Sequence, residues 1–229
     1  MEIVSPLPGT EPPHDCPRCP RLVALRAACR AEHPGWWNAP VPAFGDPAAW
    51  LAIVGLAPGK QGANRTGRPF TGDYAGDLLF ATLAAFGLSQ GRYDSRIDDG
   101  LTLDGAIICN SVKCLPPQNK PIPAEIAACR PFLERQLAAL SEVRVMIALG
   151  RIAHDAAVRS FGGRLADYRF AHGAVHALPD GRHLVDSYHC SRYNTNTGRL
   201  TPAMFADVFR TALVLTDQTS GPNSSTSPR

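Results

Sequence analysis

The sequence predicts an α/β fold in which helices cover both faces of a four-stranded parallel sheet, giving three layers. Four segments, at 49–54, 105–112, 143–150 and 183–189, are expected to be strands, and the first contains an apolar run typical of a buried strand. Helical patterns lie between these segments, and strands that alternate with helices are typical of a parallel sheet. The chain has 229 residues with 45% hydrophobic content, which suits one α/β domain.

The chain begins with a proline-rich stretch at 1–13, which we expect to be a flexible N-terminus. A C-x2-C pair follows at Cys16 and Cys19, and a helical pattern begins near Leu22. We take 14–217 as a single domain.

The first strand runs into the loop Gly55–Gly76, G-L-A-P-G-K-Q-G-A-N-R-T-G-R-P-F-T-G-D-Y-A-G. Open α/β folds bind their ligands at the carboxyl ends of parallel strands, where this loop lies. Its six glycines let the backbone approach a ligand closely. The loop therefore predicts one wall of a pocket for something flat and anionic.

The later elements complete the same pattern. In order, we expect a helix at 76–87, a loop at 89–104, a proline-rich loop at 113–123, a helix at 124–140 that Pro131 kinks or restarts, a helix at 151–161, and a last helix that Thr201 caps ahead of Pro202. The segment 218–229 is rich in Ser, Pro and Gly and predicts a disordered tail. The loops after strands one, two and four are the most unusual, and a parallel sheet brings all three to one edge.

Several function classes fit poorly. The Gly-rich loop has three residues where a Walker A motif needs four, and it lacks the G-x-G-x-x-G of a dinucleotide fold. No apolar run approaches the length of about 20 residues that spans a bilayer, and no signal peptide is recognisable. We therefore expect a cytoplasmic protein with reduced cysteines. The net charge of +3 is compatible with nucleic acid.

Four of the seven cysteines could form one metal site. Cys16 and Cys19 make one pair, and Cys114 and Cys129 a second, widely split pair. Four thiolates suit tetrahedral zinc or a [4Fe–4S] cluster, and the split spacing slightly favours the cluster. Core cysteines are the remaining alternative. Cys190 follows His189, but adjacent strand residues point to opposite sides, which argues against a nucleophile–base pair.

Side chains suited to a flipped base stand where the strands end. Phe70 offers a stacking face, and Asn110 an amide that can accept from N3–H and donate to O4 of uracil. His189 can donate a hydrogen bond to a departing base anion. Asp73 could orient water or stabilise an oxocarbenium-like sugar. Each of these residues alone could have a purely structural role. Their joint position at the strand ends is what indicates a base-binding site.

Three segments resemble the signature motifs of uracil-DNA glycosylases. They are G-L-A-P-G-x-x-G-x-N-R-T-G-R-P-F-T-G-D at 55–73, C-N-S-V-K-C-L-P-P-x-N-K-P at 109–121 and S-Y-H-C-S-R-Y-N-T-N-T-G-R-L-T at 187–201. The match is to the iron–sulfur group called family 5, or type b. Family 4 usually has Glu in its G-E-A-P-G motif and H-P-S-P after its last strand, from which Leu56 and Cys190 depart.

The resemblance implies hydrolysis of the N-glycosidic bond of uracil in DNA, without strand cleavage. Hypoxanthine and other deaminated bases would also be accepted. The fold would be the α/β/α sandwich of that family, and the four cysteines would hold a structural [4Fe–4S] cluster.

The resemblance also assigns roles to site residues. Gly55, Ala57 and Gly59 would border the base, with no polar residue just after the first strand. Asp73 is then the remaining carboxylate, and Gln61 or Asn64 could help to hold a water.

We expect the enzyme to be a monomer that contacts DNA phosphates through cations on one face. The candidates are Lys60, Arg65, Arg68, Lys113, Lys120, Arg192 and Arg199. Arg192 and Tyr193 could fill the gap left by the flipped base. Three other readings stay open: a non-catalytic protein that binds damaged DNA, an electron carrier and a zinc-ribbon module.

Overall fold

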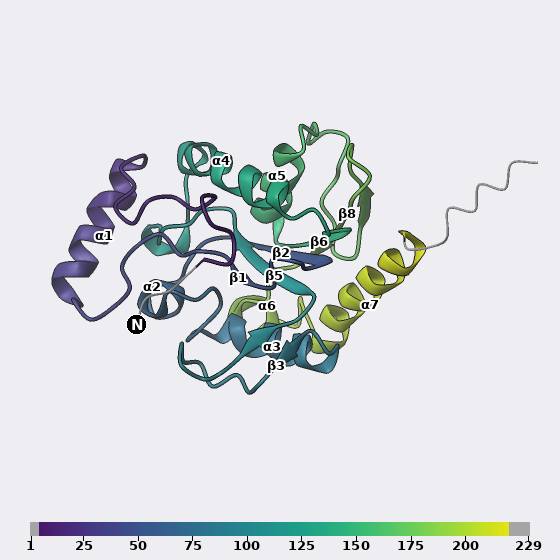
Figure 1. The fold of residues 1–229 in the computed structure, drawn as a ribbon, viewed down its shortest axis with the longest axis horizontal. Helices are drawn as coiled ribbons and strands as arrows, with labels where there is room; N and C mark the ends of the chain where they lie inside the picture. Colours follow the sequence, from purple (N-terminus) through teal and green to yellow (C-terminus); the bar gives the residue numbers. More distant parts are fainter. Residues whose placement is uncertain (1–4, 220–229) are drawn as a thin grey trace, which may run out of the picture.

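A six-stranded sheet forms the centre of the computed structural model, which describes residues 5–219 (Figure 1). The strand order is β1-β5-β2-β6-β8-β7. Its four central strands are parallel: β5 (Ala106–Asn110), β2 (Leu51–Gly55), β6 (Val145–Leu149) and β8 (His183–Ser187). These are the four expected strands.

The expectation of only four strands was wrong, because a short antiparallel strand is added at each edge. These are β1 (Phe44–Gly45) beside β5 and β7 (Val175–Ala177) beside β8. Runs of two and three residues are too short to show a period of alternation, so the sequence pattern did not reveal them.

Two separate cores show why a central strand such as β2 is apolar throughout. In β2, Leu51 and Ile53 face one core, and Ala52 and Val54 face the other. All five residues of β2 are buried. Successive strand residues point to opposite faces, so a strand covered on both faces needs a continuous apolar run.

Helices on the two faces complete the three layers (Figure 1). On one face lie α3 (Tyr74–Ala85) and α7 (Pro202–Thr219), and on the other α4 (Pro123–Ala139) and α5 (Arg151–Ser160). Pro131 lies within α4. Thr201 accepts a hydrogen bond at Oγ1 from the Met204 amide, 3.2 Å away, so it caps α7 as expected.

The smaller elements lie outside the three layers. They are α1 (Pro20–Glu32), α2 (Ala63–Thr66), β3 (Ser89–Gln90), β4 (Thr102–Leu103), the 3-10 turn η1 (Pro117–Asn119) and α6 (Arg192–Asn196). The strands β3 and β4 pair within the segment 89–104, which was expected to be a loop.

The described part of the N-terminal segment packs on the fold, in contrast to the expected flexibility of 1–13. Leu7 is buried in the α4–α5 core. Glu11 accepts hydrogen bonds at Oε1 from the Ala43 amide and from Gln136 Nε2, at 2.8 and 2.7 Å. Proline-rich composition does not report such long-range partners.

At the other end, α7 continues to Thr219, so the predicted tail does not begin at 218. The rest of that predicted tail, 220–229, lies outside the described residues. Among the described helices, none has the length and apolarity that crossing a bilayer demands.

Candidate active site

A cavity of about 570 Å³ opens at the carboxyl ends of the four parallel strands. Its walls include loop residues after β2, Asn110 at the end of β5, Gly150 and Arg151 after β6, and His189 after β8. The structure therefore brings together the three loops that the sequence singled out. The loop after β6 was missed, although its position at the same edge of a parallel sheet was a signal for it.

Phe70 forms an apolar wall of the cavity and is held from behind. Its backbone takes the left-handed conformation, with φ of 55°. Its carbonyl accepts a hydrogen bond from the Tyr93 hydroxyl at 3.1 Å. Gly76 permits this placement, because a Cβ at that position would lie 1.8 Å from the same carbonyl oxygen. The ring is 7% exposed, so one part of it remains open to the cavity.

Asn110, the last residue of β5, points an unpaired polar atom into this region. Its Oδ1 is buried and has no hydrogen-bond partner among the described residues. Gly55, the last residue of β2, lies alongside. A Cβ on Gly55 would stand 2.4 Å from that Oδ1 and 2.9 Å from the Phe70 ring. A buried amide oxygen without a partner costs free energy, which a ligand N–H would recover.

Asp73 lines the cavity and caps α3. Its Oδ1 accepts a hydrogen bond from the Gly76 amide at 3.2 Å. Burial raises the pKa of the carboxyl, against the lowering effect of the Gly76 and Ala75 amides. Its Oδ2 lies close to Gly62 and Gly59, since an added Cβ would stand 2.4 Å from that oxygen at Gly62 and 3.3 Å from it at Gly59.

His189 follows β8 and faces the cavity with a neutral ring. Burial lowers the pKa of the imidazole to about 4. Its Nδ1 is buried without a hydrogen-bond partner among the described residues. The ring is thus a neutral hydrogen-bonding group at neutral pH. Cys190 is fully buried in the α3–α7 core, so it does not share the cavity.

Ala57 and Gly59 also line the cavity, and neither offers a polar side chain. Asn64 was expected near them, but it lies apart from the cavity lining. It is 2% exposed, and its Nδ2 donates to Asn38 Oδ1 at 2.9 Å. Asn64 therefore connects α2 to the loop before β1. The prediction that it binds water or substrate was wrong.

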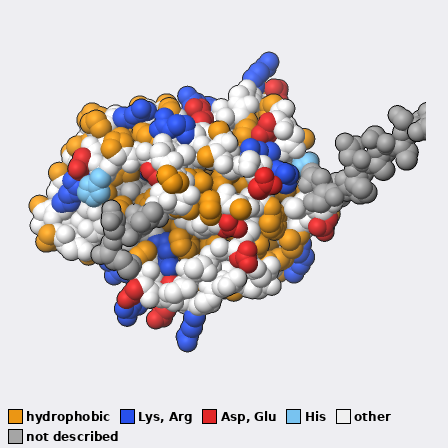
Figure 2. Space-filling model, viewed as in Figure 1, with side chains coloured by type: hydrophobic (Ala, Val, Ile, Leu, Met, Phe, Trp, Pro, Cys, Tyr) orange, Lys and Arg blue, Asp and Glu red, His pale blue; other side chains and the backbone are white. Residues whose placement is uncertain are grey.

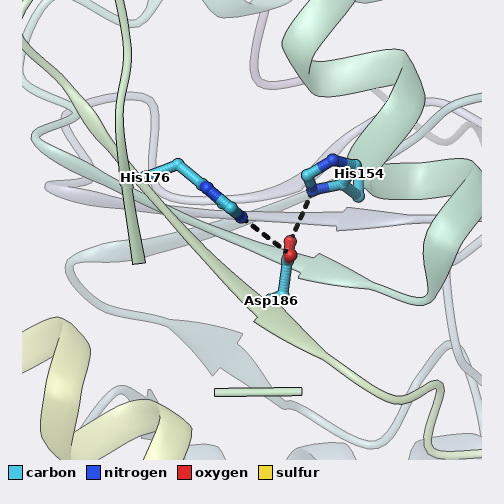
Figure 3. Close-up of side chains that lie close together, drawn as sticks. All are labelled: His154, His176 and Asp186. Atoms are coloured by element: carbon cyan, nitrogen blue, oxygen red, sulfur yellow. Dashed lines mark hydrogen bonds and ion pairs between the residues drawn. The ribbon is translucent and has the colours of Figure 1, made fainter. Parts of the chain in front are cut away.

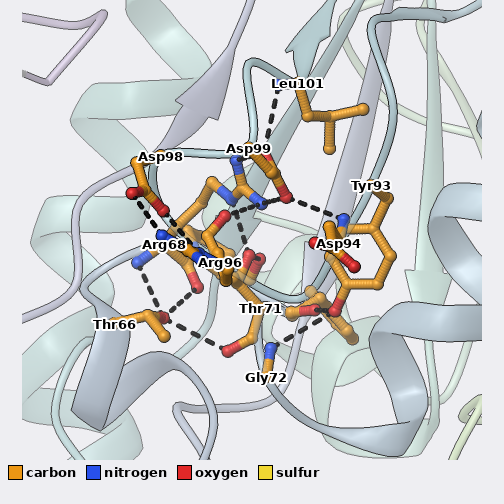
Figure 4. Close-up of polar contacts among 12 residues, drawn as sticks. Thr66, Arg68, Thr71, Gly72, Tyr93, Asp94, Arg96, Asp98, Asp99 and Leu101 are labelled. Carbon is orange, nitrogen blue, oxygen red and sulfur yellow. Dashed lines mark hydrogen bonds and ion pairs between the residues drawn. The ribbon is translucent and has the colours of Figure 1, made fainter.

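Arg68 is not a surface cation (Figure 4). Its guanidinium donates to both carboxylate oxygens of Asp99, at 2.8 and 2.7 Å, and to Thr71 Oγ1 at 2.6 Å. The side chains of Arg68 and Asp99 are only 3% and 1% exposed. Burial alone would raise the pKa of Asp99, but the Arg68 hydrogen bonds lower it. The expected phosphate contact is therefore wrong, and Arg68 fixes the loop between β2 and α3.

Lys113 is also removed from the DNA-facing set. It is fully buried, and its Nζ donates to Gln136 Oε1 on α4. The remaining candidates, Lys60, Arg65, Lys120, Arg192 and Arg199, are exposed. Arg192 stands at the cavity rim over the Tyr74 ring, and Arg199 lies over Tyr188. Lys60 pairs with Glu32 at 3.0 Å.

The four candidate ligand cysteines converge from separate segments. Cys16 and Cys19 precede α1, Cys114 follows β5, and Cys129 lies in α4, and all four line one small cavity. Burial raises the pKa of Cys19 to about 11 and that of Cys114 to about 12, in each case with Coulombic contributions from neighbouring thiols.

Donors already point at two of these sulfurs. Arg26 Nη1 donates to Cys114 Sγ at 3.7 Å, and the Lys113 amide donates to Cys129 Sγ at 3.3 Å. Such donors suit thiolates, so this residue set fits a positively charged metal centre that would hold the sulfurs deprotonated.

Comparison with known proteins agrees with this geometry. A family model described as the uracil DNA glycosylase superfamily matches residues 42–213. A type-5 uracil-DNA glycosylase of Thermus thermophilus is 50% identical over 204 residues, which cover 86% of this chain and 92% of that protein. One from Mycobacterium leprae is 43% identical over 206 residues, 86% and 90% of the two chains. A type-4 uracil-DNA glycosylase of Pyrobaculum aerophilum is 37% identical over 125 residues, 54% and 56% of the two chains.

Proposed function

The chain belongs to the uracil DNA glycosylase superfamily, and we propose that it is a family 5 enzyme that releases uracil from DNA. It hydrolyses the N-glycosidic bond of a flipped nucleotide, leaves an abasic site and does not cut the strand. The observation that carries this proposal is the convergence of Phe70, Asn110, Asp73 and His189 on one cavity.

Phe70 and Asn110 bind the base. The Phe70 ring offers the face on which a flipped base stacks. The unpaired Oδ1 of Asn110 accepts from uracil N3–H, and its amide donates to O4. A buried acceptor without a partner supports this assignment, because a base that lacks a matching N–H would leave it unpaired.

His189 stabilises the departing base. Uracil leaves as a resonance-stabilised anion, and an oriented neutral donor stabilises that charge as it forms. The lowered pKa supports a neutral ring, which donates to O2 without giving up its proton in an acid–base step.

Asp73 acts on the sugar side. As a carboxylate it orients the attacking water or stabilises the oxocarbenium-like sugar. The cavity supplies no polar side chain at Ala57 or Gly59, and this supports Asp73 as the group that acts on the water. The small residues there also leave room for larger bases, so hypoxanthine and other deaminated bases are further substrates.

Arg65, Arg192 and Arg199 contact DNA phosphates, together with Lys60 in the loop after β2 and Lys120 in the loop after β5. Figure 2 shows Lys and Arg side chains spread over the visible face rather than gathered in one patch, which fits the net charge of +3. Tyr193, which is 72% exposed next to Arg192, fills the space left by the flipped base.

Cys16, Cys19, Cys114 and Cys129 hold a structural [4Fe–4S] cluster. Zinc ribbons usually carry two C-x2-C knuckles, whereas here the second cysteine pair is widely split, and this favours the cluster. Metal analysis that finds zinc, with neither iron nor sulfide, would contradict it.

The protein acts as a monomer in the cytoplasm, in association with the nucleoid.

The proposed glycosylase activity is tested by base release from U·G, U·A, single-stranded U, hypoxanthine·T and T·G substrates, followed by alkaline cleavage. We expect uracil release, and strand breaks only after alkali. Tight binding to uracil-containing duplex without release would instead support a non-catalytic binding protein.

A further inference from the structure

A second group of ionisable side chains lies buried outside the cavity (Figure 3). His154 on α5, His176 on β7 and Asp186 on β8 bring their polar atoms within 4.8 Å of one another. The side chains of His154 and Asp186 are 1% and 0% exposed. Neither the base-binding nor the cluster assignment uses these residues.

The hydrogen bonds of His154 distinguish a metal site from an ion pair. Its Nε2 lies 2.9 Å from the carbonyl oxygen of Tyr168, which can only accept, so Nε2 carries a proton. Its Nδ1 lies 2.7 Å from Asp186 Oδ1, another acceptor. With Asp186 as a carboxylate, both ring nitrogens donate, so His154 is an imidazolium and has no lone pair left for a metal.

Asp186 is satisfied by the same arrangement. Its second oxygen, Oδ2, accepts from His176 Nε2 at 3.0 Å and from the Ala171 amide at 3.3 Å. A buried carboxylate that has a cationic partner and further donors meets the conditions under which buried charges are stable.

The surroundings of His154 support its charge. Burial works against the charged ring, but the hydrogen bond and charge of Asp186, with smaller contributions from the Tyr168 carbonyl and Asp155, raise its pKa. The rings of Phe170 and His176 lie 5.6 and 5.2 Å away, both edge-on.

The ion pair joins two elements directly behind His189. The His154 amide donates to the Gly150 carbonyl at 3.0 Å, one turn back along α5. The Gly150 amide donates to the Ser187 carbonyl at 2.8 Å, at the end of β8. A Cβ on Gly150 would lie 3.4 Å from His189 Cβ, so this turn packs against the proposed leaving-group donor.

We propose that the His154–Asp186–His176 cluster is a buried charged clamp that positions His189, and that it holds no metal. His154 and Asp186 are positioning residues, since neither lines the cavity. The expected effect on base release rests on the proposed function. The protonation state of His154 and the absence of a metal can be tested whether or not the protein is a glycosylase.

The activity test compares His154→Gln with His183→Gln. His183 begins β8, the strand that carries Asp186 near its other end, and the Nδ1 of His183 has no partner among the described residues, so it is a matched control. We expect single-turnover release by His154→Gln to fall about 10- to 100-fold with DNA affinity kept, because small misplacements of a catalytic group cost rate. The control should stay within about twofold of wild type, as expected of substitutions away from such features. Equal rates in wild type and His154→Gln would overturn the clamp.

A measurement on the wild-type protein covers the case in which the variant does not fold. The ¹⁵N shifts of the His154 ring should show both nitrogens protonated at pH 6.5. A ring with one bare nitrogen at that pH would contradict the clamp. Activity should decline as pH rises through the raised pKa of His154, where the imidazolium is lost, and His154→Gln should lack that decline.

Titration with zinc tests the metal alternative. We expect Asp186→Asn and wild type to bind equal amounts of zinc. A stoichiometric zinc ion that only the wild type binds would overturn the clamp. If the wild type releases no base at all, the proposed function fails, while the ¹⁵N and zinc measurements still test the clamp.

Discussion

The rings of Phe70 and His189 lie 6.1 Å apart between centroids, with 27° between their planes. Phe70 comes from the loop after β2 and His189 from the end of β8, and β6 lies between these strands in the sheet. The stacking face and the leaving-group donor are thus placed by the sheet rather than by one loop.

The amide of Asn110 should discriminate among bases. Replacement by Ala removes the acceptor for uracil N3–H, so the release rate of uracil should fall about 10²-fold or more, as when a single buried hydrogen-bond partner is lost. Hypoxanthine also carries an N–H beside a carbonyl, but its larger purine ring sets that edge farther from the glycosidic bond, so its release should fall less. The check is single-turnover release of both bases by Asn110→Ala. Equal losses on the two substrates would mean that Asn110 is only structural.

The absence of a side chain at Gly55 should be essential to the site. In Gly55→Ala the new Cβ would meet Asn110 Oδ1 at 2.4 Å and the Phe70 ring at 2.9 Å, displacing both base contacts. We expect kcat/KM on uracil DNA to fall at least about tenfold, because overpacking moves side chains from their positions. Gly35→Ala is the control, since its Cβ would meet nothing within 4 Å. Comparable losses in both variants would argue against a close fit at Gly55.

The pH profile should show a loss of activity on the acid side from Asp73 and no inflection near pH 6.5 from His189. Burial raises the pKa of Asp73, and the carboxylate form is the active one, so the rate should fall on the acid side at a higher pH than the ordinary Asp value of about 3.9 predicts. His189, with a pKa lowered to about 4, is already neutral at pH 6.5 and should cause no inflection there. Single-turnover rates from pH 4 to 8 check this, and an inflection near 6.5 that disappears in His189→Asn would contradict it.

Arg68 and Arg192 should behave in opposite ways on substitution. Arg68→Met leaves Asp99 buried without its partner, which costs about 3–5 kcal/mol of unfolding free energy. Arg192→Met should leave stability nearly unchanged and lower the salt dependence of DNA binding by about one phosphate contact. Denaturant unfolding and binding at several salt concentrations measure both. If Arg68→Met were as stable as wild type and had lost only DNA affinity, Arg68 would be a DNA-contacting surface residue after all.

The burial of Arg68 and Lys113 could not be predicted from the sequence. Both stand in motifs on the correct side of the sheet, yet their partners, Asp99 and Gln136, lie 31 and 23 residues farther along the chain. Residue type reports a charge but not the side chain that will neutralise or bury it. Asp99 lies in the segment 89–104, which has no helical or strand periodicity, so its pairing with Arg68 could not be inferred.

The central strands could be predicted because their signal lies in the local sequence. Burial on both faces requires a continuous apolar run, which β2, β6 and most of β5 have. β8 is the exception, since its buried residues include Asp186 and Ser187. Parallel pairing then places all strand ends at one edge, which is enough to bring Asn110 and His189 together. The His154–Asp186 pair left no such signal, because its two residues lie on elements whose contact depends on the folded sheet.

Single-turnover release of uracil from a U·G duplex tests the central claim most directly, comparing wild type with Asp73→Asn and His189→Ala. We predict that both variants bind the duplex as wild type does but release uracil roughly 10²-fold or more slowly, the loss expected when a positioned catalytic group or anion donor is removed. Wild-type rates in both variants would contradict the account, since neither residue would then act on the base or its sugar.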